Sequence, residues 1–312
     1  MRSSSPRTAT TNASTTCSSY SPPLESMNPI IQPTLFVHDR GQMCNNILQF
    51  GHVYAWAREH EYRALSMRFS YKYQYFHICH APWHTFIVYA LAKLAAKTHL
   101  LPTTDFDKEP AANEEGKSRL LQRHRFAWID GWNVRFPYLF LKYLDEIRAL
   151  FAFDTAVEQA AQLRMMPWLT RNNCIRLGVH IRRGDYASFL GGKYFYDDET
   201  MLRFIGQFQA LHPEKQMVVY ICGNDPHLQP TTYERAFPDI HFVFPQGNPG
   251  EDLCVLSHCD YLMGAPSTFS LVAAMYHDVP IWWIPSRDAT LTDDSFSHFQ
   301  SLFQQIEAYH TL

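Results

Sequence analysis

The stretch CIRLGVHIRRGDY, residues 174–186, joins an apolar strand to a charged turn. Every second residue from position 175 to 181 is aliphatic, and Arg176 and His180 alternate with them, which is the two-residue period of a β-strand. Arg182 and Arg183 follow directly where that strand ends. The stretch therefore predicts a buried strand that opens into a loop with two adjacent guanidinium groups.

Downstream of this stretch, apolar segments that resemble strands alternate with segments that resemble helices. The predicted strands are CIRLGVHI, MVVYIC, HFVFP, DYLMGAP and VPIWWIP; the predicted helices are residues 198–211, EDLCVLSHC, STFSLVAAMYHD and residues 294–309. This alternation predicts a parallel sheet covered on both faces, which binds ligands at the carboxyl ends of its strands. The arginine loop and the turns GNDP, QGNPG and APST all fall at those ends.

The amino-terminal part of the chain begins with a tail rich in Ser, Thr and Pro, which is typical of disorder. A strand at 35–37, a turn at Gly41 and a helix over 47–57 follow, and a second helix is expected at 85–100. The polar segment 102–119 is expected to be a surface loop, and two helical segments follow from residue 136. We predict a tail at 1–33, an amino-terminal domain at 34–170 and a carboxy-terminal domain at 171–312.

The composition excludes several classes of protein. A formal net charge of −3 over 312 residues argues against a nucleic-acid-binding protein, so an anion site must be local. No stretch approaches the length of a transmembrane helix. The 7 cysteines form no C-x-x-C pair, which favours a reducing compartment over a disulfide framework.

The arginine loop allows two interpretations. Arg182 and Arg183 suit a phosphate or pyrophosphate, because each guanidinium can bind two oxygens at once. Asp185 would then hold an arginine or accept a hydrogen bond from a ligand. The other interpretation is a surface ion pair of little energetic value. An adhesion role for the RGD tripeptide is disfavoured in a chain without a secretion signal.

Two further loops reach the same predicted edge. In APSTFSLVAA, Ser267 or Thr268 can cap a helix whose amino terminus would bind an anion, although an ordinary capped helix explains the pattern equally well. The loop DRGQMCNNILQF lacks the G-x-G-x-x-G spacing of a dinucleotide site. Its Asn45 and Gln49 either hydrogen-bond a ligand or cap the following helix.

Together these three loops resemble the α-1,2-fucosyltransferases of glycosyltransferase family 11. HIRRGDY matches the family's H-x-R-R-G-D motif, and GQMCNNILQF is similar to its G-R-L-G-N-Q-x-F-Q-Y. EDLCVLSHCDYLMGAPSTFS is similar to D-x-x-L-M-S-x-C-x-x-x-I-x-A-N-S-S-F-S. The resemblance spans residues 35–290 with the motifs in order. Leu271 and Val272 stand where the family has two tryptophans, Pro266 replaces an Asn and Cys44 a Gly.

The resemblance implies an α/β fold of the GT-B type: two Rossmann-like halves with parallel sheets and the donor site in the carboxy-terminal half. It implies inverting, metal-independent transfer of fucose from GDP-fucose to a glycan hydroxyl, expected to be the 2-hydroxyl of a β-galactoside. The donor-binding residues that it implies are Asn45, Arg182, Arg183, Asp252, Ser267, Thr268 and Phe269. The catalytic candidates are Arg182, Asp185 and His180, and Asp39 is a further candidate for the base.

Arg182 would contact the pyrophosphate and Arg183 would support that region, while Asp252 would recognise guanine. No metal or other cofactor is expected. The D-x-D pair of Asp105 and Asp107 falls in the predicted surface loop and is interpreted as solvated, and Cys254, His258 and Cys259 lack the spacing of zinc ligands.

Two alternatives remain at this stage: a transferase of the same fold that uses another nucleotide sugar, and a non-catalytic glycan- or nucleotide-binding relative. We expect a bacterial cytoplasmic protein, or one held peripherally at the inner face of the membrane.

Overall fold

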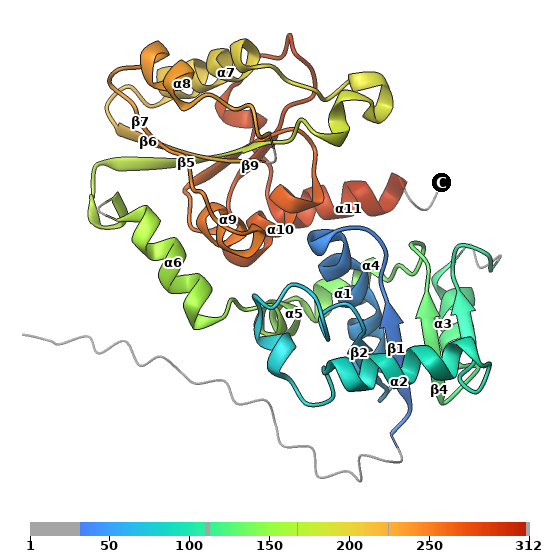
Figure 1. Ribbon diagram of the computed structural model, residues 1–312. Coiled ribbons are helices and arrows are strands. Elements are labelled where there is room, and N and C mark those ends of the chain that lie inside the picture. The colour runs from blue at the N-terminus through green and yellow to red at the C-terminus, as the bar shows by residue number, and fades with distance from the viewer. Residues whose placement is uncertain (1–31, 110–112, 167, 224, 310–312) are drawn as a thin grey trace, which may run out of the picture. The chain divides into compact units, whose positions relative to one another are not determined.

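The computed structural model describes residues 32–109, 113–166, 168–223 and 225–309 (Figure 1). Pro33–Leu312 forms one compact unit that contains two parallel sheets. The predicted tail at 1–33 lies almost entirely outside the described residues. The predicted boundary at residue 170 falls between the two sheets, and the domain limits themselves stay a prediction.

The amino-terminal sheet has four parallel strands in the order β2-β1-β4-β3. The strands are β1 (Thr34–His38), β2 (Arg63–Ser66), β3 (Thr103–Asp105) and β4 (Phe126–Asp130). The helices of this part are α1 (Met43–Glu59), η1 (His77–His80), α2 (Phe86–Lys97), α3 (Glu114–Gln122), α4 (Pro137–Lys142) and α5 (Leu144–Leu150). In the register of β1 and β4, His38 lies opposite Asp130.

The carboxy-terminal sheet has five parallel strands in the order β7-β6-β5-β8-β9. The strands are β5 (Cys174–Ile181), β6 (Gln216–Gly223), β7 (His241–Val243), β8 (Tyr261–Gly264) and β9 (Ile281–Trp283). The α-helices are α6 (Thr155–Met165), α7 (Asp198–Leu211), α8 (Pro230–Ala236), α9 (Pro249–Ser257), α10 (Thr268–His277) and α11 (Phe299–Tyr309). Short 3₁₀ turns are η2 (Trp168–Thr170), η3 (Asp185–Ala187), η4 (Phe189–Gly192) and η5 (Asp293–Ser295).

The central strand β5 has the two faces that its sequence predicts. Its aliphatic residues from Ile175 to Ile181 belong to one core together with buried residues of α7 such as Phe204 and Phe208. On the other face, Arg176 pairs with Asp260, and His180 lies near the carboxyl end of the strand. The alternation therefore separates the residues that hold the sheet from those available to a ligand.

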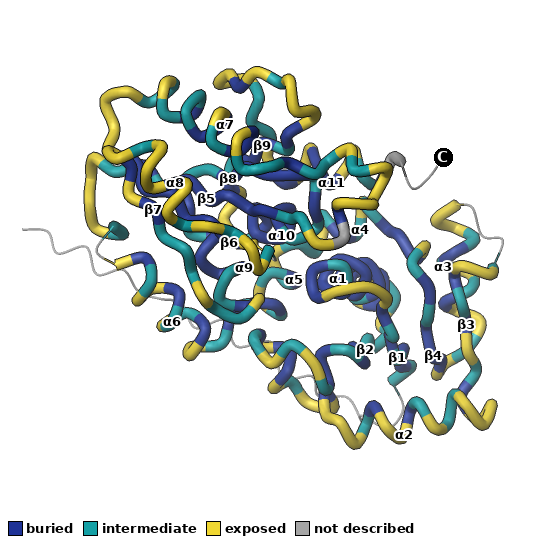
Figure 2. The backbone as a smooth tube through the Cα atoms, turned by 45° about the horizontal axis from the view of Figure 1, so that its top comes forward, coloured by how far each residue is buried: buried dark blue, intermediate teal, exposed yellow. Residues whose placement is uncertain are grey.

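Helices α1, α4 and α5 of the amino-terminal part share one hydrophobic core with α6, α9, α10 and α11. Helix α1, dark blue in Figure 2, is buried on nearly all sides and contacts α10. The ring of Phe140 on α4 lies 4.5 Å from the ring of Phe303 on α11, and the ring of His52 stacks on Phe303 at 5.5 Å. These contacts join two helices of the amino-terminal part to the last helix of the carboxy-terminal part.

The predicted fold class is confirmed, but one predicted element is wrong. The segment 102–119 is not a surface loop, because it contains β3 and the start of α3. Asp105 is the last residue of β3, so the D-x-D pair does follow a strand. The strands β2, β3 and β4 were not predicted, and the last helix begins at Phe299 rather than at 294.

Candidate functional site

A cavity of about 470 Å³ lies where the carboxyl ends of the carboxy-terminal strands face the start of α1. Such a volume is in the usual range for the binding site of a small molecule. Its walls come from both parts of the chain: Gln42, Met43, Cys44, Asn45, Tyr73, His180, Arg182, Gly223, Pro249, Asp252, Thr268 and Phe269. Six of the residues singled out from the sequence are therefore brought together: Asn45, His180, Arg182, Asp252, Thr268 and Phe269.

His180 is buried at the end of β5, and its ring stacks on Phe269 with 4.9 Å between ring centres. Burial, together with the positive charge of Arg182, lowers the pKa of His180 to about 3. The imidazole is therefore neutral in the ligand-free protein at physiological pH. Its Nδ1 is buried and makes no hydrogen bond to any described residue, so it is available to a ligand.

The two adjacent arginines have different surroundings. The Arg182 guanidinium lies over the ring of Tyr186 at 4.9 Å and forms part of the cavity wall. Arg183 instead donates from Nη1 to Asp225 at 3.0 Å and from Nη2 to Asp198 at 2.5 Å. Its Nε donates to the carbonyl of Tyr196 at 2.9 Å. Arg183 thus holds the loop behind the cavity, while Arg182 faces the space where a ligand would bind.

The amino terminus of α10 forms a second wall. Ser267 caps this helix by accepting a hydrogen bond from the backbone N–H of Phe269 at 3.2 Å, so Ser267 is the cap and Thr268 the first helical residue. The Thr268 hydroxyl donates to Oδ1 of Asn45 at 2.7 Å, which joins α10 to the first turn of α1. A helix amino terminus beside Arg182 is suited to a phosphate group.

Asp252 supplies the acidic group of the cavity. Asn248 and Glu251 form a capping box that starts α9 and places Asp252 in its first turn. Burial raises the pKa of Asp252 to about 7, although Arg164 opposes this shift. Its Oδ1 is buried and has no hydrogen-bond partner among the described residues. A carboxyl of this kind can accept hydrogen bonds from the N–H groups of a ligand.

Asp185 and Asp39 are the other candidates for the catalytic base. Asp185 begins η3, directly after the arginines, but its side chain is outside what the structure describes. Asp39 is buried after β1 and does not line the cavity. Burial raises the pKa of Asp39 well above its ordinary value, even though Arg68 lies nearby. The Asp39 carboxyl therefore holds its proton more tightly than an exposed carboxyl, and it lies outside the cavity.

The D-x-D pair is not solvated, contrary to the sequence-based interpretation. Arg40 donates to Asp107 at 2.7 Å, to Asp130 at 2.9 Å and to Asp105 at 3.3 Å. The Gln49 amide in turn accepts from the backbone N–H of Arg40 and donates to its carbonyl. Three carboxylates at the edge of the amino-terminal sheet are thus bound to one guanidinium, and Gln49 orders the loop that leads into α1.

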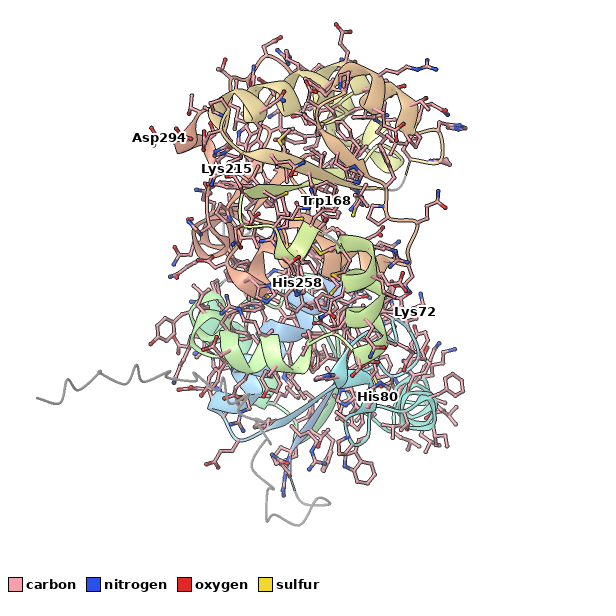
Figure 3. All side chains as sticks on the ribbon, turned by 90° about the vertical axis from the view of Figure 1, so that its left-hand side faces the viewer. Lys72, His80, Trp168, Lys215, His258 and Asp294 are labelled. Carbon is pink, nitrogen blue, oxygen red and sulfur yellow. The ribbon has the colours of Figure 1, made fainter. Side chains whose placement is uncertain are left out.

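Cys254 lies in α9, and His258 and Cys259 follow directly after that helix. The ring of His258, labelled in Figure 3, donates from Nδ1 to the carbonyl of Cys254 at 2.9 Å. Its Nε2 lies 4.0 Å from a carboxylate oxygen of Glu158 on α6. Burial raises the pKa of the Cys254 and Cys259 thiols. Within the described ranges, no group of three or more His, Cys, Asp or Glu side chains is placed to hold a metal ion.

Sequence reasoning missed several lining residues. Tyr73 lies on the segment after β2, and its hydroxyl donates to Gln42 at 3.3 Å. No periodic pattern distinguishes that segment, so no signal pointed to Tyr73. Gly223 ends β6, where an added Cβ would lie 2.3 Å from the carbonyl oxygen of Ile181. The GNDP turn indicated that a strand ends here, but it did not indicate that position 223 requires a glycine.

No protein-family model matches the sequence, and no curated protein matches it. Solved structures match its fold. A mutant of Arabidopsis thaliana FUT1 in complex with GDP aligns with a TM-score of 0.54 and 12% identity, over 86% of this chain and 73% of that chain. POFUT1 in complex with GDP aligns with a TM-score of 0.55 and 10% identity, over 79% and 95%.

NodZ alpha-1,6-fucosyltransferase co-crystallised with GDP aligns with a TM-score of 0.54 and 14% identity, over 81% of this chain and 95% of that chain. The two parallel sheets and their order along the chain are therefore those of the GT-B type found in these fucosyltransferases. At this level of identity the likeness concerns the fold, and what the cavity binds must be argued from its own residues. No helix in the described part of the chain has both the length and the hydrophobicity needed to cross a bilayer.

Proposed function

We propose that this protein is a glycosyltransferase that transfers fucose from GDP-fucose to a glycan hydroxyl, with inversion and without a metal ion. The observation that carries the proposal is the convergence of Arg182, the α10 amino terminus and Asp252 on one cavity. The Arg182 guanidinium matches the charge of a diphosphate, and the N–H groups at the α10 amino terminus match its oxygens. The Asp252 carboxylate matches the N–H edge of a purine base. The fold likeness to three fucosyltransferases solved with GDP supports this choice.

In this proposal the donor lies across the carboxyl ends of β5, β6 and β8. The Arg182 guanidinium and the free backbone N–H groups of α10 bind the diphosphate. Asp252, once ionised, accepts from the ring N–H and the amino group of guanine. Asn45 and Thr268, already joined at 2.7 Å, border the sugar end of the site.

The chemistry follows from where charge develops. The oxygen of the acceptor hydroxyl forms a bond to the anomeric carbon of fucose while the bond to the β-phosphate breaks. The electron pair of that bond stays on the phosphate, and the fixed positive charge of Arg182 stabilises it without a divalent ion. The acceptor proton passes to a base, for which Asp185 and His180 are the candidates.

His180 becomes a better proton acceptor once the donor is bound, because a neighbouring diphosphate opposes the effects that lower its pKa to about 3. In this scheme Arg183 does not touch the donor. It positions the loop that carries Arg182. The predicted acceptor, the 2-hydroxyl of a β-galactoside, rests on the family 11 resemblance alone.

A transferase of the same fold that uses another nucleotide sugar is the second candidate. The missing tryptophans favoured it, but Leu271 and Val272 are fully buried in α10 and do not line the cavity. Cys44 does line the cavity, where the family has a glycine, and is the departure that bears on the donor sugar. Its buried thiol has a raised pKa and is neutral.

The direct test is a transfer assay with GDP-fucose and lactose in the presence of EDTA, read by mass spectrometry of the product. We expect a fucosylated product, and a loss of turnover of about a hundred- to a thousand-fold for Arg182→Ala. Arg171→Ala, which alters an arginine stacked on Trp168 away from the cavity, is the matched control. Transfer from GDP-mannose alone would favour the second candidate, and nucleotide binding without transfer would favour a binding protein.

A further inference from the structure

Helix α2 presents large apolar side chains to solvent. Phe86 is 62%, Ile87 70%, Leu91 63% and Leu94 60% exposed. At 100° per residue these positions and Ala90 cover an arc of about 140° on one side of the helix. Trp83, just before the helix, is 50% exposed and extends the same apolar run. A continuous surface of this kind marks an interaction site rather than isolated exposed residues.

The opposite side of α2 is already occupied. Tyr89 and Ala92 are buried in a small core with Leu65 and Trp128 of the amino-terminal sheet, and α2 contacts β4. Tyr71, which precedes the helix, stacks on Tyr89 at 4.4 Å. The helix is thus apolar on both sides but has a partner on only one, as its alternating colours in Figure 2 show.

The segment that carries α2 has charged residues of one sign. Residues 62–104 contain no Asp or Glu, although the chain as a whole has a net charge of −3. The same stretch carries five basic residues: Arg63, Arg68, Lys72, Lys93 and Lys97. Lys72 and Lys97 are exposed, and Lys72 lies with His80 in the segment that leads into the helix (Figure 3). An apolar face bordered by positive charge is complementary to an anionic lipid surface.

We propose that α2 is an interfacial helix that docks this protein on an anionic membrane. The apolar face enters the boundary between headgroups and acyl chains, and the lysines face the lipid phosphates. Trp83 occupies the headgroup level, where indole rings are favoured. With 12 residues the helix is about 18 Å long, too short to cross the roughly 30 Å hydrocarbon layer, so it lies in the interface.

A second copy of this chain fits the face less well. Pairing two α2 helices would bring Lys93 and Lys97 of each copy together with no acidic residue on the helix to oppose them. An anionic lipid surface fits α2 better, because it covers the apolar side chains and also supplies negative charge. This inference does not depend on the transferase proposal.

The test is co-flotation of the full chain with vesicles, either of phosphatidylcholine alone or with about one third phosphatidylglycerol. The triple variant Phe86→Ser/Leu91→Ser/Leu94→Ser removes the apolar face, and because these side chains are exposed the fold is retained, which a thermal melt verifies. A second variant, Lys72→Glu/Lys97→Glu, reverses charge only. Leu163→Ser is the matched control, since Leu163 is 77% exposed on α6.

The wild type and Leu163→Ser should float with the anionic vesicles, less so in high salt. The triple variant should lose binding by at least about tenfold, and the charge variant should lose its preference for anionic lipid. The proposal is overturned if the wild type binds neither vesicle type, or if the triple variant floats with the vesicles as well as the wild type does. It is also overturned if light scattering shows a wild-type dimer that the triple variant abolishes while neither binds lipid, because a second copy then covers the face.

Discussion

Arg183 is separated from Arg182 by one peptide bond but belongs to a different part of the fold. Its guanidinium is held by Asp198 and Asp225 and is largely buried. Removing it takes away the positive charge that faces two carboxylates, although Asp198 still accepts from Tyr233 and Asp225 from the backbone N–H of His227. Arg183→Ala should therefore lower the free energy of unfolding by about 1–3 kcal/mol, discounted for the partial exposure of Asp198. Urea denaturation measures this change.

Arg182→Ala is the control for that measurement, because Arg182 faces the cavity rather than the network that holds the loop. It should leave the urea midpoint close to that of the wild type. Equal loss of stability in the two variants would mean that the division between a ligand-facing and a structural arginine is wrong.

Asp252 should make ligand-free stability depend on pH. Burial raises its pKa from 3.8 to about 7, so the folded protein holds a proton that the unfolded chain releases above about pH 4. Stability therefore falls as pH rises from about 4 to about 7. Asp252→Asn should be more stable than wild type by about 4 kcal/mol at pH 8 and indistinguishable from it near pH 3.5. Thermal melts at the two pH values measure this difference.

The same carboxyl should make donor affinity rise with pH. Guanine recognition needs the ionised form, which dominates above about pH 7. GDP-fucose is the right probe, because its diphosphate is esterified at both ends and does not titrate in this range. A wild-type affinity that is flat between about pH 6 and pH 8, or one that keeps its slope in Asp252→Asn, would remove Asp252 from guanine recognition.

At the level of elements, α1 and α10 meet at the cavity through Thr268 and Asn45. A double-mutant cycle with Thr268→Val and Asn45→Ala should give a coupling of about 0.5–1.5 kcal/mol in stability, the value of one hydrogen bond. Each single variant should also weaken GDP-fucose binding several-fold. Thr98→Val, which alters a hydroxyl at the end of α2, is the control. Additive effects would show that the two helices are not joined there.

The elements also explain how far the sequence could predict this fold. β5 and α7 have the bounds expected from the sequence, because a full alternation and a capped amphipathic helix define them. β2 and β3 are only 4 and 3 residues long, with the sequences RALS and TTD, too short and polar to show a period. Those strands owe their place to pairing with β1 and β4, which local sequence does not encode.

The residues of the site also divide into those that local sequence predicts and those that depend on distant contacts. Arg182 and Thr268 could be assigned to one sheet edge from the sequence, because they follow well-defined strands of the carboxy-terminal part. Asp252 was implied by the family resemblance alone. The separate role of Arg183 was not, since it depends on Asp198 and Asp225 from two other segments. The Arg40 pairing with the D-x-D carboxylates was missed for the same reason: it joins residues 65 or more positions apart.

At the level of the whole molecule, the shared core should make unfolding a single event. Phe303 on α11 packs against Phe140 and His52 from the amino-terminal part. Phe303→Ala should cost about 3–5 kcal/mol and lower one common transition in calorimetry rather than split it. Two separate transitions, with only one moved by the variant, would mean that the two sheets unfold independently.

The most direct measurement of the central claim is a calorimetric titration of GDP in EDTA, with the wild type and Arg182→Ala side by side. The account predicts binding at one site per chain by the wild type without a metal ion. It predicts a loss of about 1.5–3 kcal/mol in Arg182→Ala, the value of a charge-assisted hydrogen bond. Absence of GDP binding by the wild type, or equal binding by both proteins, would contradict it.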